Sequence, residues 1–176
     1  MSRRSFCYLC ATKLDQKSEN SWWCSSCLYV QYENPRPCAE LILVHDNKIL
    51  VCERGLEPCK GTYDLPGGFI EFNENTEQAL SREIKEELRL SQDDYSTPKY
   101  YLSYASEYQF GKETYHNLVT VFMANLLVDP KRIDPQDDVA SVRWVGQNEV
   151  DKTIWSSSLY IKNVHSALLS IESSDT

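Results

Sequence analysis

Two pairs of closely spaced cysteines constrain the start of the chain more than any other feature. Cys7 and Cys10 form one C-x-x-C pair, and Cys24 and Cys27 form the second after a short spacer. Two such turns supply the four thiolates of a tetrahedral Zn2+ site. A redox dithiol and two disulfides are the alternatives, but this pattern is more typical of zinc. The sequence therefore predicts a four-Cys zinc ribbon over residues 1–33.

Charge and hydropathy narrow the class of protein. The 26 acidic and 18 basic residues give a net charge of -8. This charge disfavours bulk binding to nucleic acid or to anionic membranes. The sequence has no apolar run near the roughly 20 residues of a membrane helix, and its first residues lack the apolar stretch of a signal peptide. We therefore expect a soluble, cytoplasmic protein with no membrane partner.

Strand and helix patterns fill the chain after residue 33. An extended Asn34-Pro35-Arg36-Pro37 segment leads into apolar runs that predict a hairpin with its turn at Asp46-Asn47. Further strands are expected over residues 99–109, 114–127 and 140–145, a last helix over 159–171, and a frayed tail over 172–176. This order predicts an α+β fold over residues 34–171, in which sheets are sandwiched between helices.

The best-signalled element is an acidic helix after residue 75. Asn75 and Gln78 form a capping-box pattern, and an apolar stripe recurs every four residues up to Leu88. We expect this helix to end near Ser91.

Three carboxylates crowd one face of this helix. Glu83, Glu86 and Glu87 have the i, i+3, i+4 spacing that stacks side chains over one turn. Hard cations such as Mg2+ or Mn2+ suit carboxylate ligands, and the backbone at Gly67-Gly68 could add a carbonyl. The alternative is a solvated face with an Arg82–Glu86 ion pair.

The residues around this helix resemble the Nudix box, G-x5-E-x7-R-E-U-x-E-E-x-G-U, where U is aliphatic. Gly68, Glu74 and Arg82-Glu83-Ile84-Lys85-Glu86-Glu87-Leu88 match it, whereas Arg89 stands where the motif has its last Gly. The resemblance implies a Nudix fold, an α/β/α sandwich with a mixed sheet, over about residues 34–171. A four-Cys ribbon ahead of such a domain is similar to that of NADH pyrophosphatases.

The resemblance also implies site residues. Glu83, Glu86, Glu87 and the Gly67 carbonyl correspond to ligands of catalytic Mg2+ or Mn2+. Glu74 and Arg82 correspond to positions that brace the loop and the helix. The general base differs among Nudix enzymes, so it stays open here among box and distal-loop carboxylates: Glu86, Glu87, Glu113, Asp137 and Asp138.

Substrate contacts are less constrained. Arg54 is a candidate partner for a phosphate or for a surface carboxylate. Tyr104, Tyr108 and Phe110 are candidates either to stack on a base or to fill the core. NADH pyrophosphatases carry a sequence array similar to S-Q-P-W-P-F-P-x-S after the Nudix box. At the corresponding place this chain keeps Ser103 but lacks the Gln-Pro-Trp core. ADP-ribose, an NADH-like dinucleotide and a nucleotide sugar therefore all stay open as substrates.

The resemblance implies hydrolysis of the diphosphate bond of a nucleoside diphosphate derivative, with release of a nucleoside monophosphate. The alternative is a regulatory or binding module whose Nudix domain senses a nucleotide without turnover, with Arg3-Arg4 and Trp22-Trp23 in the ribbon as a nucleic-acid-binding edge. A structural cap is the simplest role for the ribbon. The resemblance also allows a homodimer.

Overall fold

The structure is a computed structural model that describes residues 5–174, and the chain divides into two compact units, residues 1–35 and 36–176. The predicted domain boundary lies two residues before this division. The Arg3-Arg4 pair lies outside the described residues.

Unit 1 is a small antiparallel sheet. Its strands, in the order β1-β2-β3, are β1 (Asp15–Ser18), β2 (Ser21–Trp23) and β3 (Val30–Tyr32). Leu14 and Trp22 are buried together with Cys7 and Cys24, and Tyr29 packs against them. Because this apolar cluster is so small, the two buried cysteines form a large part of the core of unit 1.

Unit 2 contains a mixed sheet. Its main strands run in the order β10-β5-β4-β9-β8, with β6 beside β5 and β7 beside β4. β4 and β9 are parallel, and their other pairings are antiparallel. The strands are β4 (Arg36–His45), β5 (Lys48–Arg54), β6 (Tyr63–Asp64), β7 (Gly67–Phe69), β8 (Lys99–Phe110), β9 (Glu113–Asn125) and β10 (Val139–Val145).

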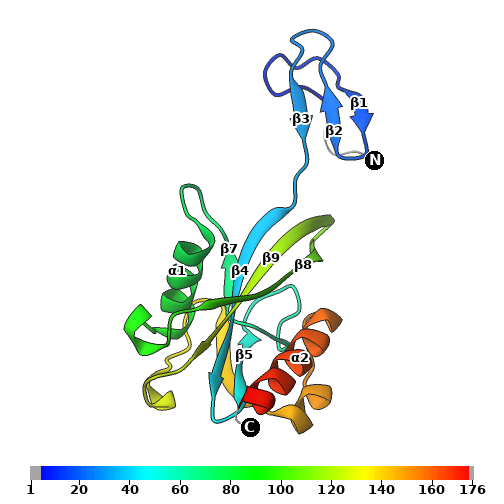
Figure 1. The fold of residues 1–176 in the computed structure, drawn as a ribbon. Coiled ribbons are helices and arrows are strands. Elements are labelled where there is room, and N and C mark those ends of the chain that lie inside the picture. Colours follow the sequence, from blue (N-terminus) through cyan, green and yellow to red (C-terminus); the bar gives the residue numbers. More distant parts are fainter. Residues whose placement is uncertain (1–4, 175–176) are drawn as a thin grey trace. The chain divides into compact units, whose positions relative to one another are not determined.

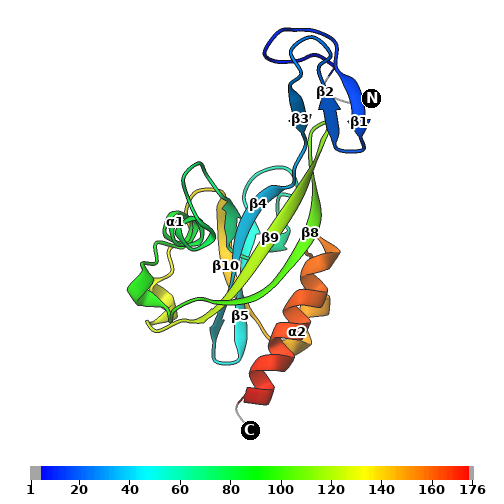
Figure 2. The same ribbon diagram turned by 45° about the horizontal axis from the view of Figure 1, so that its top comes forward.

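One helix covers each face of this sheet (Figures 1 and 2). They are α1 (Thr76–Leu88) and α2 (Ser158–Ser174), and three short 3-10 helices join the strands: η1 (Gln92–Asp94), η2 (Pro130–Arg132) and η3 (Gln147–Lys152). Side chains of β4 alternate between the faces, because successive residues of a strand point to opposite sides. Leu41 and Leu43 join the core beneath α1, whereas Ile42 and Val44 join the core beneath α2. The α+β sandwich predicted from the sequence is confirmed.

The hairpin of β4 and β5 also agrees with the prediction. His45 pairs with Lys48, so the turn consists of Asp46 and Asn47, both with positive φ. Two residues of positive φ define the type I′ turn that suits the twist of paired strands.

The end of α1 differs from the prediction. The helix ends at Leu88 rather than near Ser91, and Arg89 takes the left-handed conformation with φ 58° and ψ 22°. This is the conformation in which a glycine normally closes a helix, so Arg89 performs the turn of the motif's Gly. The last helix is longer than predicted: α2 runs to Ser174, so residues 172–174 are helical, while 175–176 lie outside the described residues.

No helix within residues 5–174 combines the length and apolarity needed to cross a membrane.

Candidate active site

Unit 1 brings its four predicted metal ligands together. The sulfurs of Cys7, Cys10, Cys24 and Cys27 all lie within 4.8 Å of one another. The Cys7–Cys27 and Cys10–Cys24 sulfurs are 3.6 Å and 3.4 Å apart. Sulfurs around a tetrahedral Zn2+ at about 2.3 Å would stand about 3.8 Å apart. The cysteines carry no disulfide, and the cluster is compatible with a zinc ribbon.

The two cysteine turns have the same backbone pattern. The amide of Ala11 donates to the Cys7 carbonyl at 2.8 Å, and the amide of Leu28 donates to the Cys24 carbonyl at 2.9 Å. Ala11 and Leu28 both have positive φ, near 60°. Glycine often takes this position because it lacks a Cβ, and here two residues with side chains adopt it.

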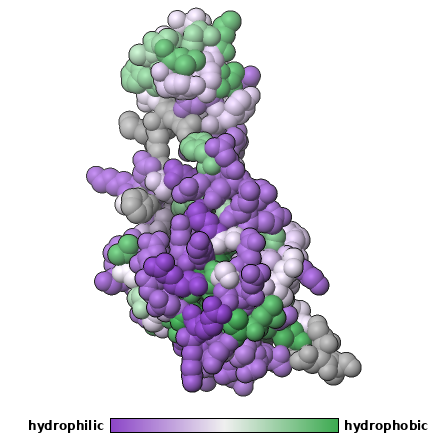
Figure 3. Space-filling view, turned by 90° about the vertical axis from the view of Figure 1, so that its left-hand side faces the viewer, coloured by the Kyte–Doolittle hydropathy of each residue, from purple (hydrophilic) through white to green (hydrophobic). Residues whose placement is uncertain are grey.

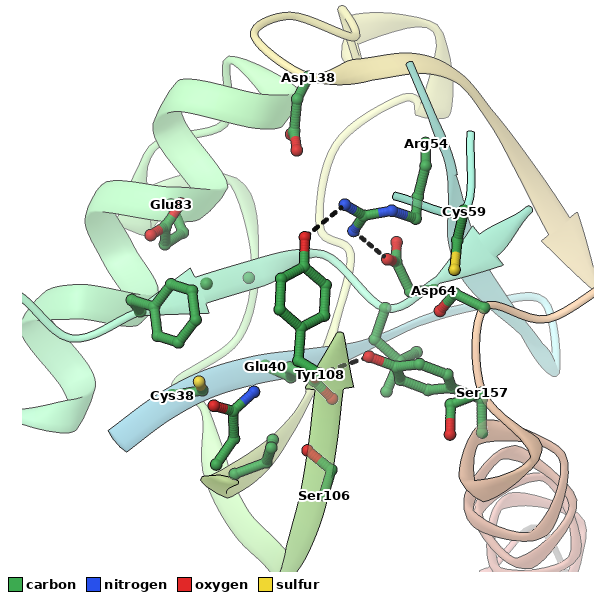
Figure 4. A pocket seen from close by; sticks show the side chains of 18 of the residues that line it. Cys38, Glu40, Arg54, Cys59, Asp64, Glu83, Ser106, Tyr108, Asp138 and Ser157 are labelled. Atoms are coloured by element: carbon green, nitrogen blue, oxygen red, sulfur yellow. Dashed lines mark hydrogen bonds and ion pairs between the residues drawn. The ribbon is translucent and has the colours of Figure 1, made fainter. Parts of the chain in front are cut away.

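Unit 2 contains a cavity of about 420 Å3. It lies between α1, the sheet and the start of α2, and Figure 4 shows side chains from all of these regions pointing toward it. Glu83, Glu87, Asp137 and Asp138 line its acidic end, and residues of the sheet, of α2 and of the connecting loops line the rest.

Local structure fixes α1 beside this cavity. Asn75 accepts a hydrogen bond from the Gln78 amide, and the Gln78 side chain accepts one from the Asn75 amide. This confirms the predicted capping box. Glu87 lies on the buried side of the helix with Leu80 and Ile84, so a carboxylate occupies a core-facing position.

Two glycines allow β7 to approach β4 and α1. The Gly67 amide donates to Glu87 Oε2 at 2.9 Å. A Cβ on Gly67 would lie 2.2 Å from the Ala39 carbonyl oxygen, and one on Gly68 would lie 2.5 Å from Glu83 Oε1. Gly67 also has a φ of 138°, so both space and backbone conformation require glycine there.

Arg82 connects three carboxylates. Its Nε and Nη2 donate to the two oxygens of Glu74 at 2.8 and 3.0 Å, and Nη2 also donates to the Phe69 carbonyl. Its Nη1 donates to Glu83 at 2.9 Å and to Glu86 at 3.1 Å. The Glu74 contact is the bidentate kind that fixes orientation.

The three box carboxylates are not equivalent. Glu87 is buried, the Glu83 side chain is 14% exposed, and the Glu86 side chain is 51% exposed. Glu86 does not line the cavity. Among the described residues, only the four cysteines bring at least three ligand atoms within 4.8 Å of one another. Arg82 contacts both Glu83 and Glu86, whereas Glu87 contacts the Gly67 amide.

Burial dominates the electrostatics of this end. The pKa of Glu87 is raised to about 9, chiefly by burial and also by the nearby charge of Glu83, against the hydrogen bond from the Gly67 amide. Burial also raises the pKa of Glu83, although Arg82 opposes this. By contrast, the hydrogen bond from Arg82 lowers the pKa of Glu74 to about 2. The site therefore combines a fixed anion at Glu74 with two carboxyl groups that burial discourages from ionising.

Arg54 lies at the cavity in a different role from either sequence alternative. Its Nη1 donates to Asp64 at 2.9 Å, its Nε to the Pro58 carbonyl, and its Nη2 to the Tyr108 hydroxyl at 3.3 Å (Figure 4). The Arg54 and Asp64 side chains are 17% and 16% exposed. This is a largely buried ion pair rather than a surface one, and it positions Tyr108.

Tyr104 leads to a residue that the sequence analysis missed. Its hydroxyl donates to Glu40 Oε2 at 3.0 Å, and the Tyr160 hydroxyl of α2 donates to Glu40 Oε1 at 2.8 Å. Glu40 is only 8% exposed and lines the cavity. Burial raises its pKa to about 7, against the two tyrosine hydrogen bonds. One feature of the sequence could have identified Glu40, because it is the single charged residue within the apolar run of β4. Since Glu is almost never buried without a partner, its place there predicts a hydrogen-bonded carboxyl group.

Two of the distal-loop carboxylates reach the cavity. Asp137 and Asp138 lie just before β10 and line it, and Figure 4 shows Asp138 pointing inward. Glu113 begins β9, is exposed and does not line the cavity.

Comparisons with known proteins agree with this architecture. The family model described as "NUDIX domain" matches residues 35–162. The ADP-ribose pyrophosphatase of Methanocaldococcus jannaschii is 47% identical over 62 residues, which cover 35% of this chain and 37% of that protein. The NAD-capped RNA hydrolase NudC of Escherichia coli is 26% identical over 136 residues, covering 73% of this chain and 48% of that protein. The matches thus span between about a third and a half of these relatives.

Solved structures share the fold. A NUDIX hydrolase from Nitrosomonas europaea has a TM-score of 0.68 at 24% identity, covering 93% of this chain and 90% of that one. The NUDIX domain of Shewanella oneidensis NrtR, solved with ADP ribose, has a TM-score of 0.64 at 18% identity, covering 80% of this chain and 90% of that one. The predicted Nudix fold is confirmed, and because the family model spans most of the sequence, the chain belongs to the NUDIX domain family.

Proposed function

We propose that the protein is a pyrophosphohydrolase that cleaves the diphosphate bond of a nucleoside diphosphate derivative and releases a nucleoside monophosphate. The observation that carries the proposal is the buried Glu87 carboxyl, which faces Glu83 at the acidic end of a cavity. Family membership and the relatives named as an ADP-ribose pyrophosphatase and a NudC hydrolase support this reaction class.

The donor set fits Mg2+ or Mn2+. Glu87 is buried and Glu83 is partly buried, so both are oxygen ligands shielded from water. Burial raises the pKa of Glu87 and the charge of Glu83 adds to this, and a divalent cation would relieve that repulsion. With the Gly67 carbonyl they would hold the ion, and Glu86 would join them by exchanging its contact with Arg82 for the metal. When bound, such an ion neutralises phosphate oxygens and activates water.

The other residues would position this chemistry. Glu74 and Arg82 fix the loop before α1 against the helix through their bidentate contact. Asp138 points into the cavity and is, with Asp137, a candidate to accept a proton from water, alongside Glu86 and Glu87. Arg54 is held by Asp64 and would orient Tyr108 at the substrate rather than serve as a free phosphate ligand.

In unit 1, we propose that the four cysteines hold a structural Zn2+. Their sulfur separations support this, and a closed four-thiolate site leaves no open position for substrate.

The decisive test compares Glu87→Gln with Glu77→Gln. Glu77 lies exposed in the first turn of α1, away from the cavity. With Mn2+ and a panel of nucleoside diphosphate derivatives, mass spectrometry should detect a nucleoside monophosphate from the wild type and Glu77→Gln. We expect Glu87→Gln to lose at least about 100-fold in rate. No product from any compound with the wild type would refute the proposal.

A second candidate is a binding module without turnover. Trp22 of the predicted binding edge is buried in the core of unit 1, so that part of the prediction is wrong. Unit 1 instead exposes Phe6, Tyr8, Leu9, Leu28 and Tyr32, and Figure 3 shows apolar side chains gathered on its surface. Exposed apolar patches often mark interaction sites. Calorimetric binding of an intact nucleotide without product would favour this candidate.

A homodimer stays a prediction, and light scattering would test it.

A further inference from the structure

The sheet presents polar side chains to the cavity where a core strand would normally present apolar ones. Glu40 of β4, Asn117 of β9 and Ser106 of β8 all line the cavity. Asn117 pairs with Arg36 on one side and with Ser106 on the other. Glu40 lies four residues further along β4 than Arg36, on the face that α2 covers, with Cys38 and Val119 in the row between it and Asn117. We call Glu40, Asn117 and Ser106 the polar floor of the cavity.

Glu40 is held as an acceptor in this floor. Tyr104 and Tyr160 donate to its two oxygens, one to each. A carboxylate offers about four acceptor positions, so each oxygen keeps one position after the tyrosine contacts. Because the tyrosines come from β8 and α2, the carboxylate is fixed from two sides.

Asn117 supplies a second acceptor. It is only 7% exposed, and its Oδ1 is buried without a hydrogen-bond partner in the described residues. A buried acceptor without a donor is costly and requires an explanation. A ligand that brings a donor to this end of the cavity would provide one.

The polar floor adjoins the acidic end of the cavity. Glu40 is the register partner of Gly67, whose amide contacts Glu87. Directly opposed residues in antiparallel strands have Cα atoms about 4.5–5.5 Å apart. Glu40 and Gly67 are therefore neighbours across paired strands, and Glu40, Glu83 and Glu87 line the same cavity.

We propose that Glu40 and Asn117 select the substrate by accepting hydrogen bonds from the hydroxyl groups of a sugar joined directly to the diphosphate. Sugar hydroxyls are donors that match two fixed acceptors, and a sugar one bond from the phosphate would reach this floor. The inference rests on the proposed function and assigns two side chains that would recognise the hydroxyls of the substrate's sugar. The sugar is either the nucleoside's ribose or the second sugar of a nucleotide sugar.

The test uses ADP-ribose and two analogues. One lacks the 2′-hydroxyl of the adenosine ribose, and the other lacks the 2-hydroxyl of the terminal ribose. We expect Glu40→Gln and Asn117→Ala each to raise the KM for ADP-ribose by roughly 10-fold, with kcat changed less than about 3-fold. For the analogue that lacks the contacted hydroxyl, wild type and variant should have the same KM. The analogue that removes the difference identifies the sugar.

Asn125→Ala is the matched control, since Asn125 is an exposed residue of the same strand outside this cavity. It should leave all three KM values unchanged. Asn117→Ala leaves the tyrosine contacts of Glu40 in place, so it tests the inference even where Glu40→Gln unfolds the protein. Equal KM increases for ADP-ribose and both analogues would overturn the inference, because they would indicate distortion rather than loss of a hydroxyl contact.

Calorimetry with Glu87→Gln separates this inference from the proposed function. If the wild type hydrolyses none of the compounds, but ADP-ribose binds about 10-fold tighter than one analogue and Asn117→Ala removes that preference, only the proposed function fails. If the wild type hydrolyses ADP-ribose, but Glu40→Gln and Asn117→Ala leave the preference unchanged, only the inference fails.

Discussion

The two units of the chain are stabilised in different ways. In unit 1, two of the four buried residues of the core cluster are cysteines, Cys7 and Cys24, beside Leu14 and Trp22. In unit 2, aliphatic residues fill both faces of a long sheet, and Leu41, Ile42 and Leu43 are completely buried. Apolar burial grows with domain size. Unit 1 would therefore depend on the Zn2+ that we propose for it, whereas unit 2 can fold on packing alone.

Removal of zinc should produce the largest difference in stability between the two units. We expect Cys24→Ser, or a strong chelator, to unfold unit 1, because structural zinc contributes about 10 kcal/mol or more to folding in small zinc domains. Amide hydrogen exchange would show loss of protection in β1–β3 and unchanged protection in β4 and β9. A parallel loss of protection in β4 would contradict the independence of the units.

A core truncation should produce the opposite pattern. Leu43 is fully buried beneath α1, and Leu43→Ala should lower the free energy of unfolding of unit 2 by about 2–5 kcal/mol. Urea unfolding measures this, and the zinc content should remain unchanged. Leu118→Ala, at a position 49% exposed on β9, is the control and should cost far less. Equal losses for the two variants would refute the packing argument.

The buried carboxyl of Glu40 should give unit 2 a pH dependence. Its pKa is raised from the ordinary 4.5 to about 7, and it faces Tyr104 of β8, Tyr160 of α2 and Asp64 of β6. The folded state holds the proton more tightly than the unfolded state, so this stability is present below pH 4.5 and is lost as pH rises through 7.

Glu40→Gln should therefore reduce the loss of stability between pH 4.5 and 7 by roughly 2–3 kcal/mol. Urea unfolding at several pH values measures the slope, and Glu77→Gln should retain the wild-type slope. An unchanged slope in Glu40→Gln would show that Glu40 ionises normally.

The smallest expected effect lies at the end of α1. Arg89 adopts the left-handed conformation with φ 58°, which is strained for a residue with a side chain. Arg89→Gly should raise the free energy of unfolding by about 0.5–1 kcal/mol, because glycine adopts this conformation without that strain. Thermal unfolding checks this. A destabilised variant would mean that the Arg89 side chain contributes contacts worth more than the strain.

The sequence was most informative where spacing alone specifies chemistry. The cysteine pairs, the Asn75–Gln78 cap and the Glu74–Arg82 pair depend on local geometry, and the structure brings each set together. The hairpin turn at Asp46-Asn47 was equally local.

The missed residues depend on contacts between distant segments. Glu40 reaches Tyr104 and Tyr160 only because β4, β8 and α2 meet at one cavity. Asp64 was missed as the partner of Arg54 for the same reason. For Glu86, the i,i+4 spacing predicted the observed contact with Arg82 as the alternative to a place beside Glu83 and Glu87, but spacing alone does not decide between the two.

Gly67 has a consequence for anyone who redesigns this protein. Any larger residue would drive its first side-chain carbon into the Ala39 carbonyl, and the shifted strand would carry the Glu87 contact with it. Directed evolution should therefore leave position 67 untouched. Mutant libraries aimed at new substrates should instead vary positions further along the cavity, such as Ser106 and Tyr108 on β8.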